Sequence, residues 1–163
     1  MHAAVTAPTE QIDVSGAPSS RKNGVLFSLI AVLALAGMAV SAVSLQRHYA
    51  KSASGFCDFG EKFNCDVVNR SEYSEIVGIP VAGIGIAGYG VLLAFSTFFR
   101  ARVETPIRLL GAAFAGLAFA LYLTYLEGHV LDTWCILCLS SLALIAAITG
   151  LAAVIKVRAG SGS

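Results

Sequence analysis

Four long apolar stretches constrain this chain more than any other feature of its sequence. An α-helix needs about 20 residues to cross the hydrocarbon layer of a membrane. The stretches run over residues 24–45, 80–99, 107–126 and 134–155, and their one charged residue is Arg108, at the start of the third. Because a spanning segment must satisfy its backbone hydrogen bonds internally, each stretch is expected to be a helix. The sequence therefore predicts an all-α membrane protein, a bundle of four transmembrane helices.

The composition agrees with a membrane protein of one domain. Of the 163 residues, 56% are hydrophobic and 13% are charged, whereas soluble domains carry about 25% charged residues. The net charge of +1 gives no sign of a nucleic-acid partner. We expect one membrane domain over residues 24–156, a disordered tail over residues 1–23, and a tail or linker remnant over residues 157–163. The first span is too long for the apolar core of a signal peptide, so we interpret it as a permanent helix.

The basic residues next to the spans predict the orientation of the bundle. The side that holds both termini carries the larger set, which comprises Arg21, Lys22, Arg100, Arg102, Arg108, Lys156 and Arg158. The other side carries Arg47, Lys51, Lys62 and Arg70. Both termini are therefore expected in the cytoplasm. The loop 46–78 and the turn 127–133 are then expected in an oxidising compartment such as the bacterial periplasm.

All four cysteines lie on this predicted outer side. Cys57 and Cys65 are in the long loop, and Cys135 and Cys138 are at the start of the fourth span. Cysteines that served as small hydrophobic residues would have no reason to gather at one face of the membrane. The clustering therefore favours joint chemistry.

Cys135 and Cys138 are three residues apart, which places both sulfur atoms on one face of a helix within reach of a disulfide. We expect them in the first turn of the fourth helix, with Asp132 or Thr133 as the N-cap. There the positive end of the helix dipole would favour a thiolate and make Cys135 reactive. This position at the lipid boundary lies between a quinone in the membrane and thiols in water. Cys57 and Cys65 fit a relay that works by thiol–disulfide exchange.

Two other interpretations of the cysteines compete with a redox relay. Two structural disulfides are common in an oxidising compartment and remain the main alternative. A zinc site is disfavoured because four-cysteine sites usually pair two short spacings, and the spacing from Cys57 to Cys65 is wider. The run Gly83-Ile-Gly-Ile-Ala-Gly88 matches a dinucleotide fingerprint, but it lies inside an apolar span, where small residues serve helix packing. No metal site is predicted.

Several of these residues resemble the vitamin K epoxide reductase family. The resemblance covers about residues 24–155 and lies in the segment Cys57-Asp-Phe-Gly-Glu-Lys-Phe-Asn-Cys65, Ser71, the stretch 78–85 and the membrane Cys-x-x-Cys. It implies a four-helix bundle around a quinone, with an outer loop and a short half-helix after Cys65 that covers the quinone pocket.

The resemblance also implies a role for each cysteine. Cys138 would deliver electrons to the quinone, and Cys135 would exchange with Cys65 through a mixed disulfide. Cys57 would be the entry point for a separate thioredoxin-fold protein, such as a DsbA-like one, and Ser71 would position the quinone head. Whether that quinone is ubiquinone, menaquinone or of the vitamin K type stays open.

The expected function is therefore a quinone-dependent thiol–disulfide oxidoreductase of the bacterial inner membrane that supports disulfide bond formation. Leu142 stands where animal members of the family carry a tyrosine, and apolar Val81 or a neighbour replaces an asparagine. We accordingly favour quinone reduction over epoxide reduction, which stays an alternative, as does a non-enzymatic membrane subunit with two structural disulfides.

The remaining polar and aromatic residues give weaker signals. His48 and His129 are interpreted as solvated interface residues rather than proton donors. Four aromatic residues are candidates for the wall of a quinone pocket, although ordinary packing or interface anchoring is the favoured explanation for each of them: Tyr89, Phe114, Tyr122 and Tyr125. The spans show no clear intramembrane charge or broken helix of the kind that marks a transporter.

Overall fold

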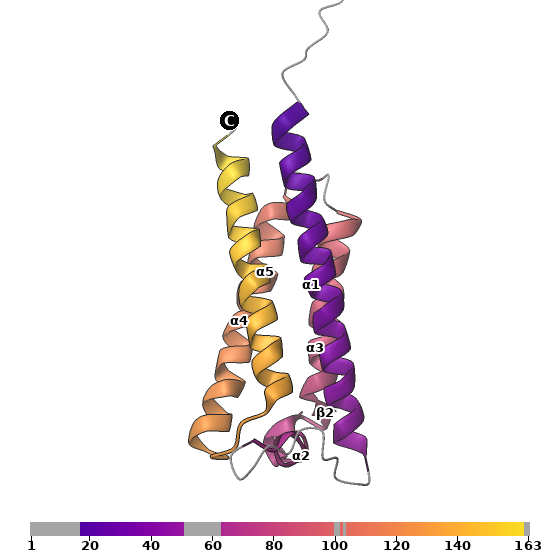
Figure 1. The fold of residues 1–163 in the computed structure, drawn as a ribbon, viewed down its shortest axis with the longest axis vertical. Helices are drawn as coiled ribbons and strands as arrows, with labels where there is room; N and C mark the ends of the chain where they lie inside the picture. The colour runs from indigo at the N-terminus through magenta and orange to yellow at the C-terminus, as the bar shows by residue number, and fades with distance from the viewer. Residues whose placement is uncertain (1–16, 51–62, 100–101, 103, 162–163) are drawn as a thin grey trace, which may run out of the picture.

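The computed structural model describes residues 17–50, 63–99, 102 and 104–161, with side chains from Asn23 onward. Four helices form an elongated bundle (Figure 1). They are α1 Ala17–Tyr49, α3 Val81–Thr97, α4 Thr105–His129 and α5 Ile136–Gly160. A short helix, α2 Cys65–Asn69, lies across the end of the bundle opposite the start of α1 and the C-terminus (Figure 1). The predicted all-α bundle and its half-helix after Cys65 are confirmed.

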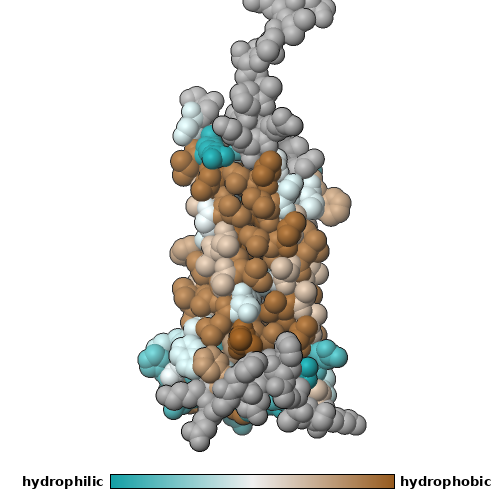
Figure 2. All heavy atoms as spheres, viewed as in Figure 1, coloured by the Kyte–Doolittle hydropathy of each residue, from teal (hydrophilic) through white to brown (hydrophobic). Residues whose placement is uncertain are grey.

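Three helices, α1, α4 and α5, are long and apolar enough to cross a membrane by themselves, and α3 is a shorter apolar helix of 17 residues. Apolar side chains cover the face of the bundle that Figure 2 shows, between two more polar ends. Outward-facing residues such as Val32, Leu35 and Phe114 are more than half exposed, and so large an apolar surface requires lipid around it. The chain is an integral membrane protein.

The observed helices extend beyond most of the predicted spans. α1 begins at Ala17 and continues to Tyr49, so it includes the last residues of the segment 1–23. α4 continues past the predicted end at Leu126 to His129, and α5 continues to Gly160 through part of the predicted tail. Hydropathy detects only the apolar part of a helix, whereas the backbone hydrogen bonds continue through polar turns. Residues 1–16 lie outside the described part of the chain.

The helices pack tightly in the half of the bundle that is nearer the termini. α1 contacts α3 and α5, and α4 contacts α5. Ile30, Leu109, Ile148 and Ile155 are completely or almost completely buried there. Burial of one such side chain stabilises the fold by about 1.5–3 kcal/mol in water, and in lipid the same close packing acts mainly through van der Waals contacts.

Small residues bring α1 and α3 together. A Cβ atom added at Gly37 would lie 2.3 Å from the Tyr89 ring, and one added at Gly85 would lie 2.8 Å from the Ser41 hydroxyl oxygen. Gly85 belongs to the run that matches a dinucleotide fingerprint, and here it allows two helices to approach. Gly83 and Gly88 of the same run meet nothing within 4 Å.

A lid connects α2 to α3. It consists of the 3-10 helix η2 Glu72–Ser74 and the antiparallel strands β1 Glu75–Ile76 and β2 Ile79–Pro80. The turn between the strands has positive φ at Val77 (55°) and Gly78 (78°), as a two-residue hairpin of type I′ requires. The hairpin leads directly into the first turn of α3.

Candidate active site

A cavity of about 420 Å³ lies inside the bundle beneath α2. All four long helices and the lid contribute to its wall, which is mostly apolar. Its volume falls within the range of about 300–1,000 Å³ that is usual for small-molecule pockets. Most polar side chains of the wall form two groups, one on α4 and α5 and one on α1, α2 and the segment that follows α2. The first group comprises Glu127, Cys138 and Ser141, and the second comprises Ser44, His48, Asn69, Ser71 and Ser74. Ser41, Tyr73 and Tyr89 also line the wall.

Three of the four predicted cysteines lie together at this cavity. Cys65 and Cys135 are buried, with exposed fractions of 1% and 0%, and pack in one cluster with Val68 and the partly buried Cys138. Cys138 lines the cavity, whereas Cys65 and Cys135 do not. Cys135 and Cys138 are not joined by a disulfide in this structure. Cys57 lies outside the described residues, so its position stays a prediction.

Backbone contacts hold Cys65 beside Cys135. The Asn64 N–H donates to the Trp134 carbonyl oxygen at 3.2 Å, and Phe63 forms a parallel bridge with Trp134. Asn64 is also the N-cap of α2, since its Oδ1 accepts from the N–H groups of Asp66 and Val67 at 3.1 Å each. The residues just before each cysteine are therefore paired, and this pairing aligns Cys65 with Cys135.

The start of α5 differs from its prediction. The helix begins at Ile136, and Cys135 itself is the N-cap residue, with an extended backbone (φ −108°, ψ 117°). Asp132 and Thr133 precede it in an irregular turn, so neither is the N-cap. Cys138 lies in the first turn of α5. The two cysteines therefore flank the beginning of the helix instead of lying on one helical face.

Cys135 is also not the activated thiol that its sequence position predicted. The hydrogen bond with the Cys138 thiol, together with burial, raises the pKa of Cys135 well above its usual range, although the neighbouring Cys65 side chain opposes this. A thiol in water-free surroundings loses its proton reluctantly because its charged form is not solvated. In the reduced protein Cys135 is therefore a neutral thiol at neutral pH.

Glu127 is a functional candidate that the sequence interpretation missed. It was assigned to an outer turn, but it lies in the last turn of α4 with an exposed fraction of 2%. Its Oε2 accepts from the Cys135 N–H at 3.0 Å, a side-chain hydrogen bond links its carboxyl group to the Cys138 thiol, and it lines the cavity. Its Oε1 is buried without a hydrogen-bond partner.

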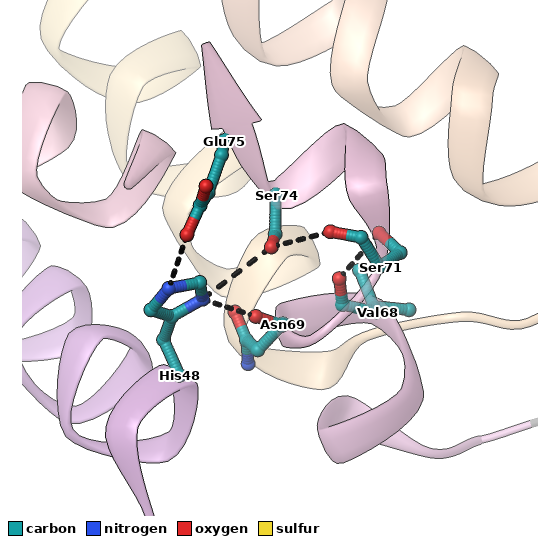
Figure 3. A network of polar contacts seen from close by, with 6 residues as sticks. All are labelled: His48, Val68, Asn69, Ser71, Ser74 and Glu75. Atoms are coloured by element: carbon teal, nitrogen blue, oxygen red, sulfur yellow. Dashed lines mark hydrogen bonds and ion pairs between the residues drawn. The ribbon is translucent and has the colours of Figure 1, made fainter. Parts of the chain in front are cut away.

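His48 lies in a polar network that joins α1 to α2 and the lid (Figure 3). Its Nδ1 is 2.6 Å from the Asn69 carbonyl oxygen, and its Nε2 is 3.0 Å from Glu75 Oε1. Both partners are hydrogen-bond acceptors. The side chain is only 12% exposed, and the prediction of a solvated histidine was therefore wrong. His129, in contrast, is exposed and stacks on Tyr125.

Asn69 connects α1 to α2 at the cavity. The Ser44 hydroxyl donates to Asn69 Oδ1 at 2.6 Å, while Asn69 Nδ2 is buried and has no hydrogen-bond partner. Ser71, the predicted quinone contact, also lines the cavity. Its hydroxyl donates to the Val68 carbonyl oxygen at 2.8 Å (Figure 3), which leaves the oxygen able to accept. Asn69 therefore lines the cavity with a donor that lacks a partner.

Of the four aromatic candidates, only Tyr89 lines the cavity. It is 5% exposed, and its hydroxyl group donates to the Ser141 carbonyl oxygen at 2.9 Å, which ties α3 to α5. Phe114, Tyr122 and Tyr125 are more than half exposed on the outer surface, where lipid or the interface surrounds them.

The periodicity of the helices carried a signal for both missed residues. On α4 the cavity wall contains Phe119, Leu123 and Leu126, and Glu127 continues this face by a 4-residue step from Leu123. On α1 the wall contains Ser44 and then His48, again a 4-residue step. Each residue lies in a turn that the apolar spans exclude.

A comparison with known families matches residues 28–153 to the vitamin K epoxide reductase family. The match extends from α1 to α5. It includes the cavity and all four cysteines.

Proposed function

The chain belongs to the vitamin K epoxide reductase family, and on this premise we propose that it passes electrons from an external dithiol to a membrane quinone. Members of this family are membrane oxidoreductases of the disulfide and quinone type. In our proposal, electrons enter at Cys57 and Cys65, continue to Cys135 and Cys138, and leave at the cavity. The product on the donor side is a disulfide bond.

The observation that carries the proposal is that three cysteines pack together and one of them lines the cavity. Cys65 is the first residue of α2, Cys135 is buried next to it, and Cys138 lies on the cavity wall. A neutral, buried Cys135 is suited to exchange with Cys65 while it stays shielded from outside thiols. A structural disulfide would not require one sulfur atom to face a cavity.

The exchange steps balance within the chain. A Cys65 thiolate attacks the Cys135 sulfur of a Cys135–Cys138 disulfide, which forms a Cys65–Cys135 bond and releases the Cys138 sulfur. A Cys57 thiolate then attacks Cys65, which forms the Cys57–Cys65 disulfide and releases Cys135. The external dithiol reduces Cys57–Cys65 and becomes a disulfide itself. Two electrons and two protons thus reach Cys135 and Cys138.

The cavity fits a flat apolar ring with polar substituents. Its wall is mostly apolar, and Asn69 Nδ2 is a buried donor without a partner, as expected of a group that binds a ligand carbonyl oxygen. Asn69 Nδ2 would donate to a carbonyl oxygen of the ring, and Ser71 and Tyr89 would position the ring. A bound quinone supplies a two-electron, two-proton acceptor. The remaining residues of the wall exclude water.

The proposal also includes the orientation of the protein in the membrane and the source of the external dithiol. The cysteine end of the bundle faces the periplasm, and both termini lie in the cytoplasm of a bacterium. The external dithiol belongs to a separate thioredoxin-fold protein. A DsbA-like protein has a potential near about −120 mV, so reoxidation needs an acceptor of higher potential, such as a quinone.

The test measures quinone-dependent oxidation of a reduced thioredoxin-fold protein by the purified chain in detergent. We expect Cys138→Ala to lower the rate at least about a thousandfold, because members of a catalytic unit fail together. Ser140→Ala is the matched control, since Ser140 is exposed on the same helical turn and is absent from the cavity wall. If the unaltered chain is inert with several quinones and donors, the cysteines form structural disulfides instead.

A further inference from the structure

Glu127 is the charged side chain most difficult to explain by structure alone. It is 2% exposed, at the end of an apolar helix, and an unpaired carboxylate there is costly. In the described part of the chain, the ion pairs involve Glu75 and Glu104, and none reaches Glu127. The groups that face its carboxyl group are the Cys135 N–H and the Cys138 thiol. Cys65, on α2, is the next titratable group, beside Cys138.

The reduced structure gives this carboxyl group two donors. The Cys135 N–H donates to Oε2, and the Cys138 thiol is its side-chain partner. When Cys135 and Cys138 form a disulfide, the Cys138 thiol proton is gone and one donor is lost. A buried carboxylate with one fewer donor binds a proton more readily. Oxidation and reduction of the pair therefore change the protonation of Glu127.

We propose that Glu127 is a catalytic residue that exchanges a proton with the Cys138 sulfur each time the Cys135–Cys138 bond opens or closes. The proposal rests on the thiol relay described above and adds the group that moves its proton. When a Cys65 thiolate attacks Cys135, the departing Cys138 sulfur takes the proton of the Glu127 carboxylic acid. The products are the Cys65–Cys135 disulfide, the Cys138 thiol and the Glu127 carboxylate.

Charge and electrons balance in this step. The Cys135–Cys138 bond breaks and the Cys65–Cys135 bond forms, so Cys65 is oxidised and Cys138 is reduced. The negative charge moves from the Cys65 sulfur to Glu127. If Glu127 were already a carboxylate at this step, a thiolate would form against it, and two like charges would oppose each other in a low dielectric. In the reverse direction Glu127 takes the proton from Cys138 and generates the thiolate.

Infrared difference spectroscopy tests the proton transfer in the unaltered chain without quinone. The purified protein is reduced with dithiothreitol and reoxidised with a small disulfide, and the two spectra are subtracted. We expect a band of a protonated carboxylic acid in the oxidised protein that is lost on reduction. This band is expected to remain in Glu75→Gln, which alters the half-exposed carboxylate of the lid. It is expected to be absent in Glu127→Gln.

Kinetics supply the second measurement. In the Glu127→Gln variant, an amide oxygen can still accept from the Cys135 N–H, but no proton can be exchanged. We expect release of the Cys138 thiol after attack on the Cys135–Cys138 disulfide to slow at least about tenfold, because general acid–base catalysis typically contributes 10²–10⁴-fold. Glu75→Gln is expected to react at the rate of the unaltered chain.

Two results would overturn the proposal: no carboxylic acid band that changes with the redox state of the unaltered chain, or equal rates in a folded Glu127→Gln variant. The spectrum needs no variant, so misfolding of Glu127→Gln leaves the test intact. Neither measurement uses quinone. A chain that passes both but fails to oxidise a thioredoxin-fold protein with quinone would refute the proposed function and keep the role of Glu127.

Discussion

The two polar sides of the cavity use their hydrogen bonds differently. On the side of α4 and α5, Glu127 contacts the Cys135 N–H and the Cys138 thiol, and its Oε1 has no hydrogen-bond partner. On the side of α1 and the lid, His48 has an acceptor for each ring nitrogen, and the hydroxyl groups of Ser71 and Ser74 donate within the protein (Figure 3). The Ser44 hydroxyl group likewise donates to Asn69. In our proposals the first side serves proton and electron transfer, and the second side holds the lid on the bundle.

Asn69 combines completed hydrogen bonds with a buried group that has no partner. Its Oδ1 and its carbonyl oxygen belong to the lid network, whereas its Nδ2 is buried without a partner at the cavity. Completed hydrogen bonds stabilise a fold, and buried groups without partners call for another explanation, such as a ligand or a reaction. The following predictions test this division, from the largest expected effect to the smallest.

The largest contrast concerns the reactivity of Cys135. Burial and the Cys138 thiol raise the pKa of Cys135, so it forms little thiolate at neutral pH. We expect reduced Cys135 to be alkylated at least about a hundredfold more slowly than a small-molecule thiol at pH 7, because only the thiolate reacts. Mass spectrometry of the labelled peptide measures this rate.

The pH dependence of the alkylation rate distinguishes the raised pKa of Cys135 from simple inaccessibility of its thiol. The rate at Cys135 is expected to keep rising with pH beyond about 9, where ordinary thiols have become thiolates. A plateau at the ordinary pKa would contradict the raised value. The same shift lowers stability as pH rises through the ordinary pKa, because the unfolded chain then loses a proton that the folded chain retains.

On the lid side, His48→Ala is expected to loosen α2 and the hairpin. The change leaves the buried carbonyl group of Asn69 without its partner at 2.6 Å, which costs about 1–3 kcal/mol. Amide hydrogen exchange over residues 65–76 should therefore accelerate about tenfold or more, while exchange in the middle of α5 changes little. His129→Ala, at the exposed histidine of α4, is the control. Equal protection in both variants would mean that the network does not hold the lid.

The smallest expected effect is on quinone binding through Asn69. Asn69→Asp keeps an acceptor for the Ser44 hydroxyl group and removes the Nδ2 donor. Loss of one hydrogen bond of about 1–1.5 kcal/mol raises the KM for quinone about tenfold. Ser44→Ala, which leaves Nδ2 in place, should raise it less. Steady-state kinetics measure both, and an unchanged KM in Asn69→Asp would remove this residue from the proposed quinone contacts.

Much of the bundle follows from the sequence because lipid imposes strong rules. The second apolar stretch, predicted over 80–99, is the helix Val81–Thr97, and the half-helix after Cys65 is present. The predicted ends of the other spans were less accurate, since a helix continues through polar turns. Those extra turns carry His48 and Glu127, so both were interpreted as residues of the outer surface.

The sequence by itself determined that this chain lies in a membrane, that its helices form a bundle, and that Cys65, Cys135 and Cys138 lie at one end of it. Apolar length and the requirement for internal hydrogen bonds are local properties, and they can be read directly from the residues. Only the tertiary structure decided that Cys135 is a buried N-cap, that Cys138 faces the cavity, and that Glu127 lies against both. Burial and hydrogen-bond partners depend on segments far apart in the chain, and those contacts determine which side chains can react.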